Sequence, residues 1–148
     1  MPDGRDPLKP RRHYRAWRRV TLRWADNDVY GHVNNAVYWQ WFDTAVNEWL
    51  IAHGLLDVAR GGVVGFVVET GCRYARPLSY PGAVEIGIAV VRLGRSSVTY
   101  RLGVFAEGAE EASAEALWTQ VCVERETGRP VPVPDAWRER LSAVDEMR

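Results

Sequence analysis

A long apolar helical stripe followed by strand-like segments is the feature that most limits how this chain folds. Large side chains recur there at spacings of three and four, as on one face of an α-helix: Tyr38, Phe42, Ala45, Val46 and Trp49. Trp39, Trp41 and Leu50 widen the apolar surface, and the stripe ends near His53 and Gly54. We therefore expect a central helix that other elements cover on most sides.

The segments on either side of this helix alternate in polarity, as half-buried strands do. The first spans residues 17–24, and four more follow the helix at residues 63–74, 84–90, 98–104 and 114–124. Gly65 and Gly71 are expected to mark bulges or close backbone approach, and Asp135 to cap a short final helix through Leu141. This order predicts an α+β domain in which an antiparallel sheet wraps around the helix.

Size and charge define the broad class of the protein. At 148 residues the chain suits one domain, with 47% hydrophobic and 26% charged residues, as in globular proteins. Its formal net charge of zero argues against nucleic acid as a partner. No apolar run reaches the ~20 residues of a membrane span, and no signal peptide is recognisable, so we expect a cytoplasmic protein without a membrane partner.

The N-terminal residues, the cysteines and the tryptophans give three further expectations. Residues 1–14 are rich in proline and basic side chains and show no regular period, which predicts a flexible basic tail ahead of a single domain at residues 15–148. Cys72 and Cys122 lie in predicted strands without metal-site spacing, which is typical of reduced core thiols. Seven tryptophans in so short a chain suggest that some aromatic surface is buried against a second copy.

The segment between the first strand and the helix concentrates polar groups that suit acyl chemistry. It holds two carboxylates, Asp26 and Asp28, the imidazole of His32, and the amides of Asn34 and Asn35. Either asparagine can cap the helix, which would leave backbone N–H groups to bind an oxyanion. We interpret Asp26 as a loop hydrogen-bonding group, and we leave His32 open between substrate binding and a structural hydrogen bond.

The pattern Trp-x-Asp-x-Asp-x-x-Gly-His-Val-Asn-Asn-x-x-Tyr, from Trp24 to Tyr38, resembles the hotdog-fold acyl-CoA thioesterases of the 4-hydroxybenzoyl-CoA thioesterase group. The similarity extends to Tyr74-x-Arg76-Pro77-Leu78, to the turn at residues 93–97 and to residues 128–134. It covers roughly residues 17 to 135, as expected for a match over one domain.

This resemblance implies a hotdog fold in a homodimer or homotetramer, with active sites at the dimer interface and acyl-CoA as the substrate. It places the catalytic carboxylate on Asp28 and the oxyanion site on backbone N–H groups near Asn35. Asp28 would either activate a water or attack the carbonyl, and the sequence leaves both routes open. Neither route needs a metal or a cofactor.

Further residues are expected around the substrate by the same analogy. Arg95, Ser96 and Ser97 on their turn, together with Arg76, are candidates for contacting the CoA phosphates or pantetheine arm. The candidates for the acyl pocket are Tyr38, Trp41 and Phe42, while Asp43 is expected as a polar contact at an interface.

Two other functions use the same features. A hotdog hydratase or dehydratase would pair Asp28 with His32 for proton transfer on an acyl thioester. A non-catalytic acyl-CoA binding module would use the pocket without turnover.

Overall fold

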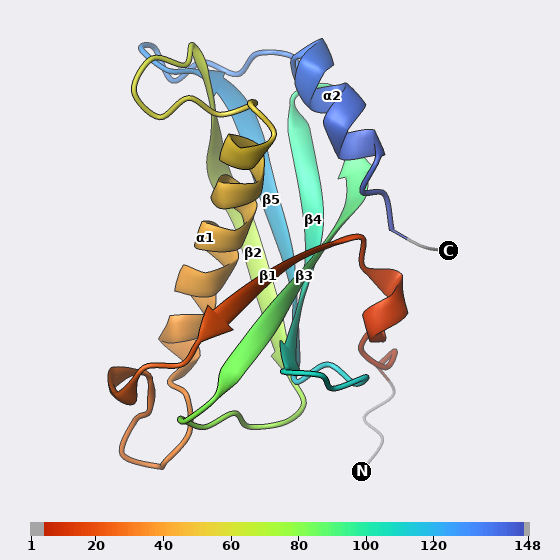
Figure 1. Cartoon of the computed structure of the whole chain (residues 1–148). Helices are drawn as coiled ribbons and strands as arrows, with labels where there is room; N and C mark the ends of the chain where they lie inside the picture. The colour runs from red at the N-terminus through yellow and green to blue at the C-terminus, as the bar shows by residue number, and fades with distance from the viewer. Residues whose placement is uncertain (1–4, 147–148) are drawn as a thin grey trace.

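The chain folds into an antiparallel sheet with a long helix along one face (Figure 1). The structure, a computed structural model, describes residues 5–146. In chain order its elements are η1 (Arg11–His13), β1 (Ala16–Thr21), η2 (Trp24–Asp26), α1 (Asn35–Ala52), β2 (Val63–Tyr74), β3 (Ala83–Leu93), β4 (Ser97–Ala106), β5 (Ala114–Glu124) and α2 (Asp135–Ser142). The strands lie in the order β1-β3-β4-β5-β2, so that β1 and β2 form the two edges of the sheet.

The predicted central helix is confirmed as α1. The Asn34 side chain caps it by accepting a hydrogen bond from the Ala36 N–H at 2.9 Å. His53 is the C-cap, and Gly54 follows with a φ of +72°, a conformation that glycine adopts without strain. The Asn34 cap and Gly54 therefore determine where α1 begins and ends.

The core lies between α1 and the face of the sheet that it covers. Phe42, Val46 and Leu50 of α1 are fully buried, and the Phe42 ring lies 6.0 Å from that of Trp118 on β5. All neighbouring strands pair antiparallel. This is the α+β hotdog arrangement that the sequence predicted.

Three local details differ from the expectations. The first strand ends at Thr21, because the chain turns into η2 where Trp24 had been assigned to a strand. The bulge in β2 lies between Val67 and Glu69 rather than at Gly65 or Gly71, although the expected close approach is found at Gly65, where a Cβ atom would lie 2.7 Å from Gln120 Oε1. Helix α2 begins at Asp135 with Pro134 at the N-cap, so Asp135 stands in the first turn and does not cap the helix.

The described part of the predicted flexible tail, residues 5–14, packs against the sheet, whereas residues 1–4 lie outside the described residues. His13 and Tyr14 are buried, and the Arg11 side chain donates to Glu85 at 2.8 Å. The basic composition predicts a flexible segment, yet the Arg11 guanidinium also lies over the ring of Trp17, 4.7 Å from its centroid. These residues therefore form an ordered strap.

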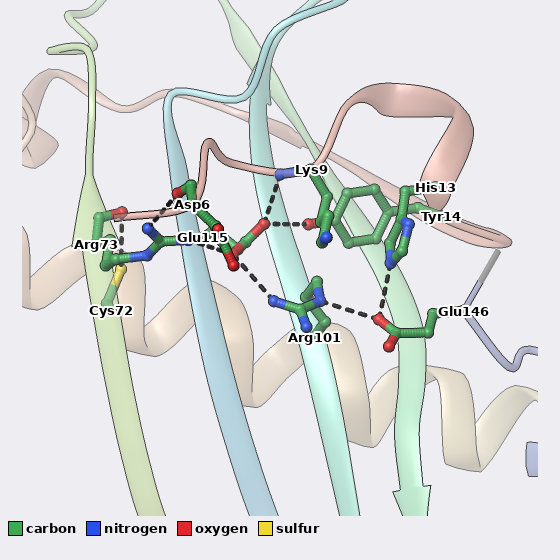
Figure 2. A network of polar contacts seen from close by, with 9 residues as sticks. All are labelled: Asp6, Lys9, His13, Tyr14, Cys72, Arg73, Arg101, Glu115 and Glu146. Carbon is green, nitrogen blue, oxygen red and sulfur yellow. Dashed lines mark hydrogen bonds and ion pairs between the residues drawn. The ribbon is translucent and has the colours of Figure 1, made fainter. Parts of the chain in front are cut away.

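A polar network holds this strap on the face of the sheet opposite α1 (Figure 2). The buried Glu115 carboxylate accepts hydrogen bonds from the Lys9 N–H at 2.7 Å and from Arg73 and Arg101, each at 3.1 Å. Arg101 also donates to Glu146 at 3.0 Å, and Glu146 lies 2.7 Å from His13 Nε2. The network thus connects both ends of the described chain to the sheet. Between residues 5 and 146 no helix is long and apolar enough to cross a membrane.

Candidate functional site

The loop before α1 is held at its start by Asp26. This residue is 1% exposed, and its carboxylate accepts the Arg23 backbone N–H at 2.7 Å and two guanidinium N–H groups of Arg23 at 2.9 and 2.8 Å. Its backbone carbonyl accepts the N–H of Asn34 at 2.9 Å. The interpretation of Asp26 as a loop hydrogen-bonding group is confirmed.

A tight turn then presents Asp28. The Asp28 N–H donates to the His32 carbonyl at 2.9 Å, and the Gly31 N–H donates back to the Asp28 carbonyl at 3.1 Å. Gly31 has a φ of +82°, a region that side chains disfavour and that this turn requires. The half-buried Asp28 carboxylate accepts the Tyr30 N–H through Oδ1 at 2.9 Å. Its Oδ2 atom has no hydrogen-bond partner among residues 5–146 and is available to a substrate or a water.

The start of α1 provides backbone donors next to this turn. The Ala36 N–H is used by the Asn34 side chain, and the Val37 N–H donates to the Asn34 carbonyl at 2.9 Å. The Asn35 N–H has no acceptor in the described part of the chain, and Asn35 itself is exposed. A helix N-terminus attracts negative charge, so this N–H suits an oxyanion.

A cavity of about 450 Å³ brings these groups together. Its wall combines the turn, the start of α1 and the end of β2, and the lining residues are Asp28, Tyr30, His32, Val33, Asn35, Tyr38, Tyr74, Ala75, Arg76 and Pro77. The His32 side chain is exposed and makes no hydrogen bond with other residues between 5 and 146. Asp28, His32 and Asn35, predicted from one motif, thus line one cavity.

Two tyrosines form the apolar wall of this cavity. The rings of Tyr38 and Tyr74 meet edge to face with centroids 5.1 Å apart. Burial, with a contribution from the nearby Cys72, raises the pKa of each tyrosine to about 12. Both phenols therefore stay neutral at physiological pH and can donate a hydrogen bond but not act as a base.

The predicted acyl-pocket residues separate into two groups. Tyr38 lines the cavity, whereas Trp41 and Phe42 are 6% and 0% exposed and belong to the core beneath α1. Tyr30 and Tyr74 line the cavity but were not among the predicted site residues. Tyr74 was detectable as the first residue of the Tyr-x-Arg-Pro-Leu motif at a strand end, whereas nothing in the sequence distinguished Tyr30.

Of the predicted CoA-binding residues, only Arg76 lines this cavity. Its guanidinium pairs with Glu111 at 2.7 Å and donates to the Ala112 carbonyl at 2.8 Å. The turn of Arg95, Ser96 and Ser97 lies at the opposite end of the sheet.

The strand register fixes the separation between that turn and the cavity. Tyr74 at the cavity pairs with Ala114, which pairs in turn with Val104, whereas Ser97 pairs with Val121 at the other end of β5. At ~3.3 Å per residue, the stretch of β4 from Ser97 to Val104 corresponds to roughly 20 Å. Within one chain this turn is too far away to share the cavity with Asp28.

The remaining titratable groups offer no second centre. Cys72 and Cys122 are free thiols, and burial raises the pKa of Cys122 to about 11 and that of Cys72 above its usual value. Within residues 5–146, no cluster of three or more His, Cys, Asp or Glu side chains has the arrangement of a metal site.

The chain is similar in sequence and fold to several known proteins. A model of the thioesterase-like superfamily matches residues 22–141. The long-chain acyl-CoA thioesterase FadM of Escherichia coli (strain K12) is 26% identical, over 85% of this chain and 96% of FadM. The crystal structure of the PA5185 protein from Pseudomonas aeruginosa is 45% identical and covers 93% of this chain and 96% of its own, with a TM-score of 0.89. Slr0204, a 1,4-dihydroxy-2-naphthoyl-CoA thioesterase from Synechocystis, shares the fold at 16% identity, with a TM-score of 0.76 over 85% of this chain and 94% of its own.

Proposed function

This chain belongs to the thioesterase-like superfamily and is a thioester hydrolase, and from this premise we propose that it hydrolyses an acyl-CoA to the free acid and CoA. One observation carries the proposal. Asp28 and Asn35 line the same cavity at the start of α1, and among residues 5–146 neither Asp28 Oδ2 nor the Asn35 N–H has a hydrogen-bond partner, so a carboxylate and an oxyanion donor are available to one thioester. The name of the relative FadM supports acyl-CoA as the substrate class.

In the proposed reaction the thioester carbonyl oxygen faces the Asn35 N–H and the N-terminus of α1. The helix dipole and this N–H stabilise the negative charge that develops on the oxygen. Asp28 Oδ2 then either takes a proton from an attacking water or attacks the carbonyl carbon itself to form a mixed anhydride. In both routes the C–S bond breaks and the CoA thiolate leaves. In the direct route the attacking water supplies the hydroxyl of the acid; in the covalent route a water then cleaves the anhydride, which releases the acid and restores the Asp28 carboxylate. His32 at the rim of the cavity contributes polarity and a hydrogen bond.

The site is completed by a second copy of the chain. Phe66, Val67 and Val68 on the edge strand β2 are 49, 41 and 59% exposed, a row of apolar groups next to unpaired backbone. If two β2 strands pair antiparallel across a two-fold axis, the start of one lies beside the end of the other. That arrangement brings the turn of Arg95 to Ser97 from the partner subunit toward the cavity of this one.

CoA would then be held by groups from both copies. Arg76 of one chain contacts the pantetheine arm or a phosphate near the cavity, and Arg95, Ser96 and Ser97 of the partner subunit contact the phosphates. Under this proposal the predicted CoA-binding residues lie at two ends of the sheet because each CoA contacts both copies.

A hydratase is the second candidate because Asp28 and His32 line one cavity. The two functions differ in the bond that changes, since hydration of a 2-enoyl thioester leaves the thioester intact. The test follows free thiol and the enoyl absorbance together for saturated and 2-enoyl-CoA substrates of several lengths. The proposal predicts thiol release from saturated acyl-CoA. Loss of enoyl absorbance without thiol would establish the hydratase, and binding without either change would establish a binding module.

A further inference from the structure

Five buried side-chain atoms have no hydrogen-bond partner among residues 5–146. One is Arg18 Nε on β1, whose guanidinium is already paired with Glu48 of α1. The other four lie on β4 and β5, between the sheet and α1: Tyr100 Oη, Trp118 Nε1 and both Oε1 and Nε2 of Gln120, on residues that are 0, 4 and 2% exposed. An unpaired buried donor or acceptor costs about 1–3 kcal/mol, so such groups are uncommon in a core without a functional reason. Their clustering points to a polar group that comes from outside the chain.

The three side chains are neighbours on the face of the sheet that α1 covers. Tyr100 on β4 pairs directly with Trp118 on β5, and Gln120 is the next residue of β5 on the same face. The Trp118 ring lies 6.0 Å from the rings of both Phe42 and Trp39 on α1. The unpaired atoms therefore belong to three neighbouring side chains within an otherwise apolar layer.

Gly65 shows where the amide of Gln120 points. A Cβ atom built at Gly65 would lie 2.7 Å from Gln120 Oε1, so the amide extends over β2 into the space that this glycine leaves free. Val67, which pairs with Gln120, is 41% exposed, and Thr70 on the same face is exposed as well. The amide thus lies at the border between the covered core and the open part of β2.

That open face of β2 leads to the candidate active site. Thr70, Cys72 and Tyr74 follow Val67 on the same face, and Tyr74 lines the cavity with Asp28. At ~3.3 Å per residue, the stretch from Val67 to Tyr74 measures roughly 20 Å, comparable to an extended acyl chain. Trp39 of α1 lies beside this stretch of β2, since its ring contacts that of Trp118 and it is close enough to Tyr74 to affect the pKa of the tyrosine.

Resting on the proposed thioesterase function, we propose that Gln120, with Tyr100 and Trp118, binds a hydrogen-bonding oxygen at the far end of the acyl group. The substrate class is then an acyl-CoA that carries a hydroxyl or oxo group distant from its thioester. The Tyr100 hydroxyl and the Trp118 N–H donate hydrogen bonds, and the Gln120 amide can both donate and accept. Burial, aided by Cys122, raises the pKa of Tyr100 above its usual range, so its hydroxyl keeps the proton that it donates.

The test compares CoA thioesters of straight-chain acids, eight to sixteen carbons long, with and without a hydroxyl on the terminal carbon. We expect the wild type to prefer the hydroxylated member of at least one pair by about tenfold or more in kcat/KM. Gln120→Met removes the amide and keeps the length of the side chain, and it should reduce the preference to about twofold or less. The melting temperature should not fall, because the variant removes polar atoms that have no partner among residues 5–146.

Thr119→Val is the matched control on the opposite face of β5. It removes the 2.9 Å hydrogen bond between Thr119 and Thr99 and should leave the preference unchanged. If Gln120→Met does not fold, Tyr100→Phe removes a single oxygen and serves the same purpose. Thiol release without any preference for hydroxylated substrates, or a preference that survives both variants, overturns the assignment. Absence of release from every thioester would instead refute the thioesterase function itself.

Discussion

Arg23 and Asp26 form a closed pair in which three N–H groups of the arginine, at 2.7 to 2.9 Å, occupy both carboxylate oxygens of the aspartate. Two residues further on, Asp28 keeps one oxygen unpaired within residues 5–146 and directs its carboxylate to the cavity. The two carboxylates of the motif therefore have different tasks. Asp26 holds the loop, and Asp28 is the residue that we propose for catalysis.

Asp26→Asn should destabilise the protein. The substitution leaves Arg23 donors without their charged partner and disturbs the loop that positions Asp28, and we expect a loss of about 1–3 kcal/mol in the free energy of unfolding. The Arg23 side chain is 67% exposed, so solvent screens part of its ion pair with Asp26 and limits the loss of stability. Urea unfolding measures it. A variant as stable as the wild type would show that the pair does not hold the loop.

Substitutions at Asn34 and Asn35 should separate the cap from the oxyanion donor. Asn34→Ala removes the bond to the Ala36 N–H and should cost about 1 kcal/mol of stability, with Asn34→Ser restoring most of it. Asn35→Ala keeps the backbone N–H, so kcat should stay within about threefold of the wild type. A large loss of kcat in Asn35→Ala would assign the role to the side-chain amide, contrary to the proposed backbone role.

Glu146 should stabilise the protein at neutral pH and lose this effect in acid. Burial alone raises the pKa of Glu146, but hydrogen bonds from His13 and Arg101 outweigh burial and lower it. The folded pKa of Glu146 lies below its unfolded value of about 4.3. The stabilisation of the folded state by the Glu146 carboxylate is therefore complete above about pH 4.3 and is lost as the pH falls through the folded pKa.

The measurement compares urea unfolding of the wild type and Glu146→Gln between pH 7 and pH 3. The wild type should be the more stable at pH 7, and the difference should shrink at the acidic end. Glu85, whose pKa is lowered by the Gly108 N–H and by Arg11, stays in both proteins and cancels in the comparison. A difference that grows toward low pH would contradict the account of the strap.

Dimerisation along β2 should be sensitive to a charge at that edge. Val68→Lys places an ammonium group at the bulge, where the proposed second copy would pair, and should shift the protein toward monomer and lower its activity on acyl-CoA. Val58→Lys is the control, because Val58 is 63% exposed but lies outside the strands. Light scattering after gel filtration gives the mass. An unchanged mass and activity in Val68→Lys would exclude this edge as the interface.

The sequence was most informative where local chemistry determines the structure. Capping by Asn34, termination at Gly54 and the alternation along residues 63–74 depend on neighbouring residues, and they led to the correct helix and strand. The same holds for the cluster of Asp28, His32 and Asn35, because one short segment, residues 28–35, carries all three.

The features that the sequence did not reveal depend on residues far apart in the chain. The strap at residues 5–14 is ordered by Glu115 and Glu146, whose positions only the folded sheet defines. The separation of Arg95 from Arg76 likewise follows from the pairing of β4 with β5. The bulge near Val68 has no glycine to mark it.

The most direct test of the proposed mechanism is the rate of CoA release by Asp28→Asn compared with that of Asp57→Asn. Asp57 is an exposed aspartate whose Oδ1 accepts backbone N–H groups of Ala59 and Arg60, so it resembles Asp28 in its turn but lies outside the cavity. With both variants folded, Asp28→Asn should lower kcat/KM by about 10²- to 10⁴-fold, and Asp57→Asn should leave it near the wild-type value. Full activity in folded Asp28→Asn would contradict the proposed mechanism.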